Sequence, residues 1–157
     1  MRVVSTDARA RFGEASVDLL FVDGSHAYED VKTDLDQWLS ALRPGGTIAF
    51  NDPFWPGVNR LLLERACTAG TPLRRPTFAD NTVFFTYFPG HDWAAADKRA
   101  ARTLRRVLRV GGACEPRYQL PVSNARLPYP VKFALVWPAT RGLRRLFEAL
   151  LARYGRA

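Results

Sequence analysis

Residues 17–26 read Val-Asp-Leu-Leu-Phe-Val-Asp-Gly-Ser-His, and the first six of them form a short, nearly continuous apolar run. A run of this length that ends at an Asp-Gly pair is typical of a strand buried on both faces of a parallel sheet. The sequence therefore predicts a strand over Val17–Val22, with polar side chains beginning at Asp23.

The segment that follows has the period of a helix. Between Tyr28 and Arg43 the large apolar residues recur in steps of four, three, one and three, which places them on one helical face. Pro44-Gly-Gly46 is a helix stop signal, and Thr47–Phe50 is a second apolar run, predicted to be a strand. Strand, helix and strand joined by short loops form a βαβ unit, so the sequence predicts a parallel α/β architecture.

Further along the chain the alternation continues. We expect a helix near Val58–Ala69 and a β-rich stretch over Asn81–Phe88. A helix follows over Trp93–Val110, which we expect to end at Gly111-Gly112.

The last part of the chain has a different character. Glu115–Pro130 contains four prolines and is predicted to be irregular, whereas Thr140–Tyr154 has the apolar stripe of an amphipathic helix. We therefore divide the chain into a first domain, residues 1–90, and a basic, mostly helical extension, residues 91–157.

Composition limits the class of protein. A chain of 157 residues that is 47% hydrophobic can bury a packed core, and it contains no apolar stretch of the roughly 18–20 residues that span a membrane. Cys67 and Cys114 lie far apart, without neighbours at zinc-ligand spacing. We expect a cytoplasmic protein with reduced thiols and no spanning segment.

The net charge of +8 is unevenly distributed. Residues 1–66 hold seven basic and ten acidic side chains, whereas residues 67–157 hold sixteen and five. A positive patch on the helix after Trp93 makes a nucleic-acid-binding module a competing hypothesis. We disfavour nucleic acid as a partner because no binding motif is present and basic helices are usually solvated faces.

Polar side chains follow the two predicted strands of the βαβ unit. Asp23 ends the first strand, Asn51-Asp52 end the second, and His26 lies three residues beyond Asp23. Ligands bind beyond the carboxyl ends of parallel strands, which are only about 4.8 Å apart. Carboxylate and amide oxygens there suit Mg²⁺, but such residues also cap helices or bind loop amides, so both interpretations stay open.

The motifs that carry a family resemblance are Val17–His26, Tyr28, Val31, Asp34-Leu35, Trp38, Leu42, Pro44-Gly-Gly46 and Asn51-Asp52. Together they resemble the class I S-adenosylmethionine-dependent methyltransferases. Within that family the chain is most similar to the branch with macrolide-sugar O-methyltransferases and, more distantly, catechol O-methyltransferase. The resemblance is strong over Val3–Pro53, weaker to Phe88 and absent beyond about Asp92.

The resemblance implies roles for particular residues. Asp23, Asn51 and Asp52 match the metal ligands of that branch, and His26 matches the position of its general base. The implied reaction is Mg²⁺-assisted O-methylation of a small hydroxylated acceptor, such as a sugar, with S-adenosylmethionine as the methyl donor.

The chain departs from the family at the cofactor site. Val3–Thr6 resembles the third strand of the family, and Asp7 and Ala8 then match its adenine contact. The family's Gly-rich loop has no counterpart, because the chain contains no Gly-x-Gly. The implied fold is a partial Rossmann-like doubly wound sheet that lacks its first strands, followed by the helical basic extension.

A partial sheet has consequences for function. We expect an exposed hydrophobic edge, low solubility, and either a homo-oligomer or a complementing chain. A start codon placed too late in a longer gene is the explanation we favour, and a catalytically inactive remnant or binding module is the alternative function.

Overall fold

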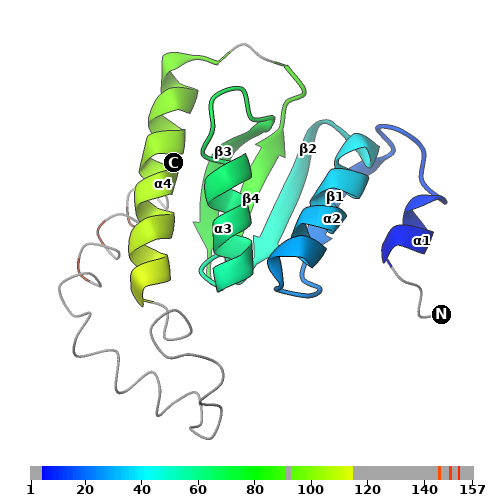
Figure 1. The fold of residues 1–157 in the computed structure, drawn as a ribbon. Coiled ribbons are helices and arrows are strands. Elements are labelled where there is room, and N and C mark those ends of the chain that lie inside the picture. Colours follow the sequence, from blue (N-terminus) through cyan, green and yellow to red (C-terminus); the bar gives the residue numbers. More distant parts are fainter. Residues whose placement is uncertain (1–4, 91–92, 115–144, 146–148, 150–151, 153–157) are drawn as a thin grey trace, which may run out of the picture.

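The computed structural model describes residues 5–90 and 93–114, together with residues 145, 149 and 152 (Figure 1). Its elements are, in chain order, α1 (Ser5–Arg9), β1 (Val17–Val22), α2 (Tyr28–Trp38), the 3₁₀ turn η1 (Leu39–Ala41), β2 (Leu42–Asn51), α3 (Pro56–Arg65), β3 (Leu73–Ala79), β4 (Thr82–Tyr87) and α4 (Ala95–Cys114). Among these described helices, none is both long enough and apolar enough to cross a membrane. The expected irregular segment 115–130 and most of the expected helix 140–154 lie outside the described residues.

The four strands form one sheet in the order β1-β2-β4-β3. β1 and β2 are parallel and joined through α2, which confirms the predicted βαβ unit, and β4 runs antiparallel to both β2 and β3. Figure 1 shows α2, α3 and α4 side by side over one face of this sheet. The mixed, partly parallel sheet is consistent with the predicted partial Rossmann-like fold.

The core lies between that face of the sheet and the three helices. Phe50 of β2 and Phe85 of β4 meet edge to face, with ring centroids 6.1 Å apart, and both side chains are buried. Buried leucines from the three helices cover them: Leu35, Leu61, Leu62, Leu104 and Leu108. Full burial of each such side chain stabilises the fold by about 1.5–3 kcal/mol.

The boundary between α2 and β2 differs from the prediction. The helix ends at Trp38, and β2 begins at Leu42 rather than at Thr47, so Pro44-Gly-Gly46 lies within the strand. Val17 faces Leu42 and Leu19 faces Thr47, which leaves a bulge in β2. Glycine suits this bulge because a Cβ at Gly46 would lie 3.0 Å from the Asp18 carbonyl oxygen of β1.

Two further elements differ from the prediction for a similar reason. β3, which the sequence did not indicate, contains Pro76, and its register against β4 shifts between Arg74 and Thr77. Proline is tolerated at bulges and on edge strands, and β3 is an edge of the described sheet. α4 continues past Gly111-Gly112 because Gly112 packs against Asn59 of α3, where a Cβ would lie 3.1 Å from its Oδ1.

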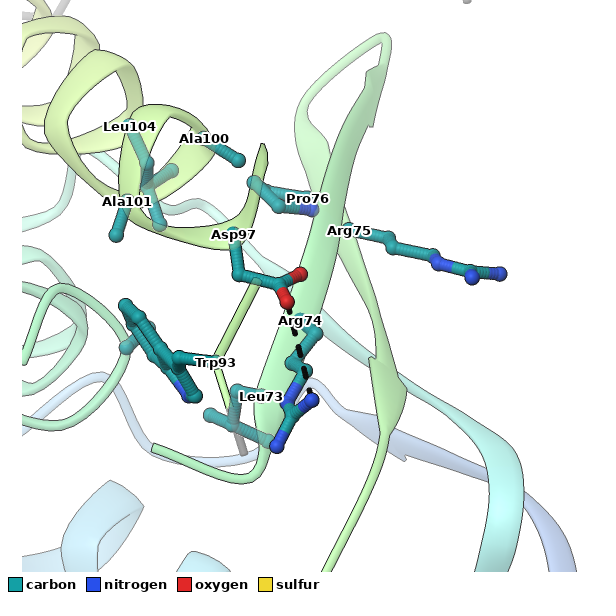
Figure 2. Close-up of a pocket in the computed structure, with 10 residues that line it drawn as sticks. Leu73, Arg74, Arg75, Pro76, Trp93, Asp97, Ala100, Ala101 and Leu104 are labelled. Atoms are coloured by element: carbon teal, nitrogen blue, oxygen red, sulfur yellow. Dashed lines mark ion pairs between the residues drawn. The ribbon is translucent and has the colours of Figure 1, made fainter. Parts of the chain in front are cut away.

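The first turn of α4 packs on β3 (Figure 2). An ion pair of 3.8 Å joins Arg74 of β3 to Asp97 of α4, and both side chains are largely buried. Trp93, Leu73 and Leu104 surround a cavity of ≈10 Å³ beside this pair, about enough room for one water molecule. α4 is thereby part of the packed core rather than a free helix.

At the other end of the sheet the structure corrects the prediction for Val3–Thr6. Ser5 and Thr6 belong to the helix α1, not to a strand, while Val3 and Val4 lie outside the described residues. α1 is held on α2 because Trp38 Nε1 donates a hydrogen bond of 2.8 Å to Ser5 Oγ. β1 is therefore an edge strand among the described residues, and it leaves Leu19 59% and Phe21 54% exposed.

Candidate functional site

Asp23 and Asn51 meet at the carboxyl ends of β1 and β2. Asn51 Nδ2 donates a hydrogen bond of 2.8 Å to Asp23 Oδ1, although the two residues are 28 positions apart. The parallel pairing of Val22 with Phe50 brings them together, as the sequence predicts. On its other side Asn51 Oδ1 accepts a weak hydrogen bond of 3.4 Å from Thr82 Oγ1 of β4.

Asp52 is held on two sides just beyond β2. Its backbone has a φ of +49°, a left-handed conformation that Asp tolerates better than most residues. Its backbone N–H donates to the Asn81 carbonyl oxygen at 2.9 Å, and Asn81 Nδ2 donates to its carboxylate. The turn between β3 and β4 thereby fixes the direction of the Asp52 carboxylate.

His26 faces the free side of that carboxylate. Its Nε2 lies 3.2 Å from Asp52 Oδ2, and both side chains are 22% exposed. The two atoms are close but not aligned as a hydrogen bond. The imidazole also lies against Trp55, with ring centroids 4.9 Å apart and an interplanar angle of 38°. Asp23, His26, Asn51 and Asp52 thus end on one rim of the sheet.

The donor set consists of two carboxylates, one amide and one imidazole. Hard oxygen donors of this kind suit Mg²⁺, which commonly uses one or two carboxylates and keeps several waters. Among the described residues no three His, Cys, Asp or Glu side chains are grouped closely enough to hold a metal ion by themselves. A cation held by the predicted set of Asp23, Asn51 and Asp52 would take the amide oxygen of Asn51, whereas in this structure the amide nitrogen faces Asp23.

A cavity of ≈400 Å³ lies beside the same rim. It is lined by Ser5, Leu20, Phe21, Val22, Asp23, Gly24, Asp34 and Trp38. Its volume falls within the range of about 300–1,000 Å³ that is usual for small-molecule sites. Asp7 and Ala8, which the sequence indicated as cofactor contacts, lie on α1 and are not among its lining residues.

Two residues at this rim were not indicated by the sequence: Asn81 and Thr82. Asn81 and Thr82 reach the site because β4 pairs antiparallel with β2, so that Thr82 is opposite Asn51. The sequence did predict a strand here, because a β-rich stretch begins at Asn81. The sequence did not indicate that this strand pairs with β2.

A hydrogen-bonded cluster next to the site ties α2 to α3. Tyr28 Oη donates to Glu64 Oε2 at 2.5 Å, Arg60 Nε donates to Glu64 Oε1 at 2.9 Å, and the Arg60 guanidinium lies over the Tyr28 ring. The Tyr28 hydrogen bond, together with Arg60, lowers the pKa of Glu64, and the same bond raises the pKa of Tyr28. This cluster fixes the first turn of α2, which starts two residues after His26.

Comparison with known proteins gives a family match for the segment that contains the rim residues. Residues 2–53 match the family model described as a methyltransferase domain. This part of the chain is similar to a methyltransferase domain. The matched residues include α1, β1, α2 and β2, and all four of the predicted catalytic and metal-binding residues.

A curated relative of this chain is also found, but its name states no function. A 52-residue stretch is 42% identical to "Uncharacterized protein y4gI" of Sinorhizobium fredii (strain NBRC 101917 / NGR234). The match covers 33% of this chain and 6% of that relative's length. No solved structure matches the chain significantly.

Proposed function

We propose that the protein carries the metal and base site of a methyltransferase that uses S-adenosylmethionine to methylate a hydroxyl group of a small acceptor. The observation that carries the proposal is the presence of two contacts, Asn51 with Asp23 and His26 with Asp52, on one rim within the segment similar to a methyltransferase domain. Asp7 and Ala8 remain candidates for contacts to the adenine of the methyl donor.

The carboxylates and the amide have a binding role in this proposal. Asp23, Asn51 and Asp52 would hold Mg²⁺, which when bound supplies the positive charge that lowers the pKa of an acceptor hydroxyl. Asp23 and Asp34 also give a negative border to the ≈400 Å³ cavity beside β1. A cationic sulfonium is favoured next to such carboxylates, so we place the methyl donor in this cavity.

His26 acts as the base. Because its Nε2 faces Asp52, the neutral tautomer with a proton on Nε2 leaves Nδ1 to accept the proton of the acceptor hydroxyl. Asp52 then stabilises the imidazolium that forms. The acceptor oxygen forms its new bond to the methyl carbon as the bond between that carbon and the sulfonium sulfur breaks, and the sulfur keeps the electron pair and leaves as a neutral thioether.

A transfer assay tests the proposal. S-adenosylmethionine with a tritiated methyl group is incubated with the 157-residue chain, Mg²⁺ and a panel of catechols and sugars. We expect Mg²⁺-dependent labelling that His26→Ala lowers by about 10²–10⁴-fold, the usual contribution of a general base. Asp30→Ala, an exposed position on α2, is the matched control and should leave labelling unchanged.

The contrary result would favour the alternative function. If a folded chain labels no acceptor, and if Asp23→Ala and His26→Ala change only its stability, the site is an inactive remnant of a methyltransferase.

A further inference from the structure

A row of basic side chains on α4 borders a groove whose lining residues are distinct from those of the candidate site. The groove has a volume of ≈400 Å³ and runs between α4 and the segment that follows α3. Its basic lining residues are Lys98, Arg102, Arg105, Arg106 and Arg109, and Cys67, Ala69, Trp93 and Ala101 complete it. Among the described residues that line the groove, none is acidic.

The spacing of these residues places them on one helical face. The pairs 98/102, 102/105, 102/106, 105/109 and 106/109 are three or four residues apart, so like charges lie about 5–6 Å apart at Cβ. Such pairs destabilise a helix by about 0.2–0.5 kcal/mol each. The first and last of them are separated by about 16 Å along the axis at 1.5 Å per residue.

On α2 and α3, by contrast, basic residues form ion pairs with acidic residues of the same helix. Lys32 pairs with Asp36 on α2 at 3.1 Å, and Arg60 pairs with Glu64 on α3 at 2.9 Å, each within one helical turn. On α4 the acidic residue Asp97 pairs with Arg74 of β3, outside the groove. Within the described residues, no ion pair neutralises the five basic residues of the groove.

Most of these side chains are also not needed for packing. Lys98, Arg102, Arg106 and Arg109 are exposed. Arg105 is half-buried, and its Nη2 donates a hydrogen bond of 2.6 Å to the Cys67 carbonyl oxygen, which fixes the guanidinium at the wall of the groove. Ala101, which has a small side chain, also lines the groove.

The sequence alone disfavours nucleic acid as a partner, but the basic residues border a groove rather than a flat solvated face. We therefore propose that this groove binds the phosphate backbone of single-stranded nucleic acid. A strand carries one phosphate per about 3.4 Å when stacked, so a row of about 16 Å spans about five phosphates. A hollow between a helix and a loop fits a narrow chain better than it fits a flat membrane surface. Trp93, which borders both this groove and the small cavity of Figure 2, supplies an aromatic wall of the kind on which bases stack.

This activity is separate from the proposed methyl transfer. None of the groove residues lines the cavity beside β1 or belongs to the rim of Asp23, His26, Asn51 and Asp52. An experiment can therefore disprove one of the two proposed functions without affecting the other.

The test measures the fluorescence anisotropy of a labelled oligothymidylate with the full chain at increasing salt. The oligonucleotide is longer than the about 4–16 nucleotides that single-strand grooves occupy. The double variant Arg102→Ala/Arg106→Ala removes two groove charges. Arg11→Ala/Arg99→Ala is the matched control, because it removes the same charge from exposed positions outside the groove, one of them on the same helix.

We expect the folded chain to bind the oligonucleotide with an affinity that falls steeply with salt. The groove variant should lose about tenfold or more in affinity and reduce the salt slope by about 1.4, whereas the control should lose much less. Circular dichroism confirms that both variants are folded. The proposal is overturned if the folded wild-type chain does not bind at low salt, if both double variants lose the same affinity, or if phosphatidylserine vesicles or polyglutamate bind through Arg102 and Arg106 and the oligonucleotide does not.

Discussion

Gly57 lies directly against the backbone of His26. A Cβ at Gly57 would be 2.2 Å from the His26 carbonyl oxygen and 2.6 Å from the Tyr28 backbone nitrogen. The first turn of α3 therefore approaches the loop after β1 more closely than any residue with a side chain allows. The backbone that carries His26 is thereby packed directly on α3.

The first prediction concerns this approach. Gly57→Ala should lower the free energy of unfolding by about 1–3 kcal/mol, because the loop must move away from α3. Gly13→Ala is the control, since a Cβ there would have no neighbour within 4 Å. Urea unfolding of both variants measures the difference. Equal stability of the two would show that α3 does not hold the His26 loop in this way.

The second prediction concerns cation binding at the rim. Tb³⁺, an oxygen-seeking cation, should bind next to Trp55 and show luminescence when the indole is excited, and Mg²⁺ should compete for the site. Asp23→Asn and Asp52→Asn should each weaken binding at least about tenfold, since each removes one of two carboxylates. Asp30→Asn should bind as the wild type does. Unchanged luminescence in Asp23→Asn and Asp52→Asn would place the cation elsewhere.

The third prediction concerns Cys67. Burial raises the pKa of its thiol to about 11, although Arg105 and Arg109 act in the opposite direction. A folded-state pKa above the reference value of 9.0 stabilises the fold below pH 9.0, and this stability is lost as the pH rises toward about 11. In a Cys114→Ser background, unfolding stability should fall across this window, and further substitution of Cys67→Ala should reduce the fall. The same slope with and without Cys67 would be the contrary result.

Features that depend on local sequence were predicted correctly. Val17–Val22 was predicted to the residue because a short apolar run bounded by Asp-Gly is a local signal. The contact between Asp23 and Asn51 followed from it, since parallel neighbours bring their carboxyl ends together.

The errors share a different cause. Pro76 concealed β3, and Gly112 suggested the end of α4. Pro44-Gly-Gly46 suggested that the helix continues to Arg43 and that the strand begins only at Thr47, whereas α2 ends at Trp38 and β2 begins at Leu42. Each of these residues is used for a bulge or for a close approach to a neighbouring element. Such contacts depend on residues far away in the chain, so local propensity could not reveal them. The roles of Asn81 and Thr82 were hidden for the same reason.

The fourth prediction concerns the exposed edge at β1. Leu19 and Phe21 alternate along the strand, so they present large apolar side chains on the same face. Leu19→Lys/Phe21→Lys should reduce self-association, as measured by sedimentation velocity. Phe12→Lys is the control, because Phe12 is 44% exposed but does not belong to the strand and packs on Trp38 of α2. A wild-type chain that stays monomeric at high concentration would contradict this prediction.

Binding of the methyl donor tests the central claim most directly. S-adenosylmethionine is titrated calorimetrically into the full chain with and without Mg²⁺, and into the variant Asp34→Asn, which alters one carboxylate of the cavity beside β1. We predict saturable but weak binding, because the chain contains no Gly-x-Gly loop, and a further loss of affinity in Asp34→Asn. A folded chain that gives no binding heat under either condition would contradict the proposal that this cavity receives S-adenosylmethionine.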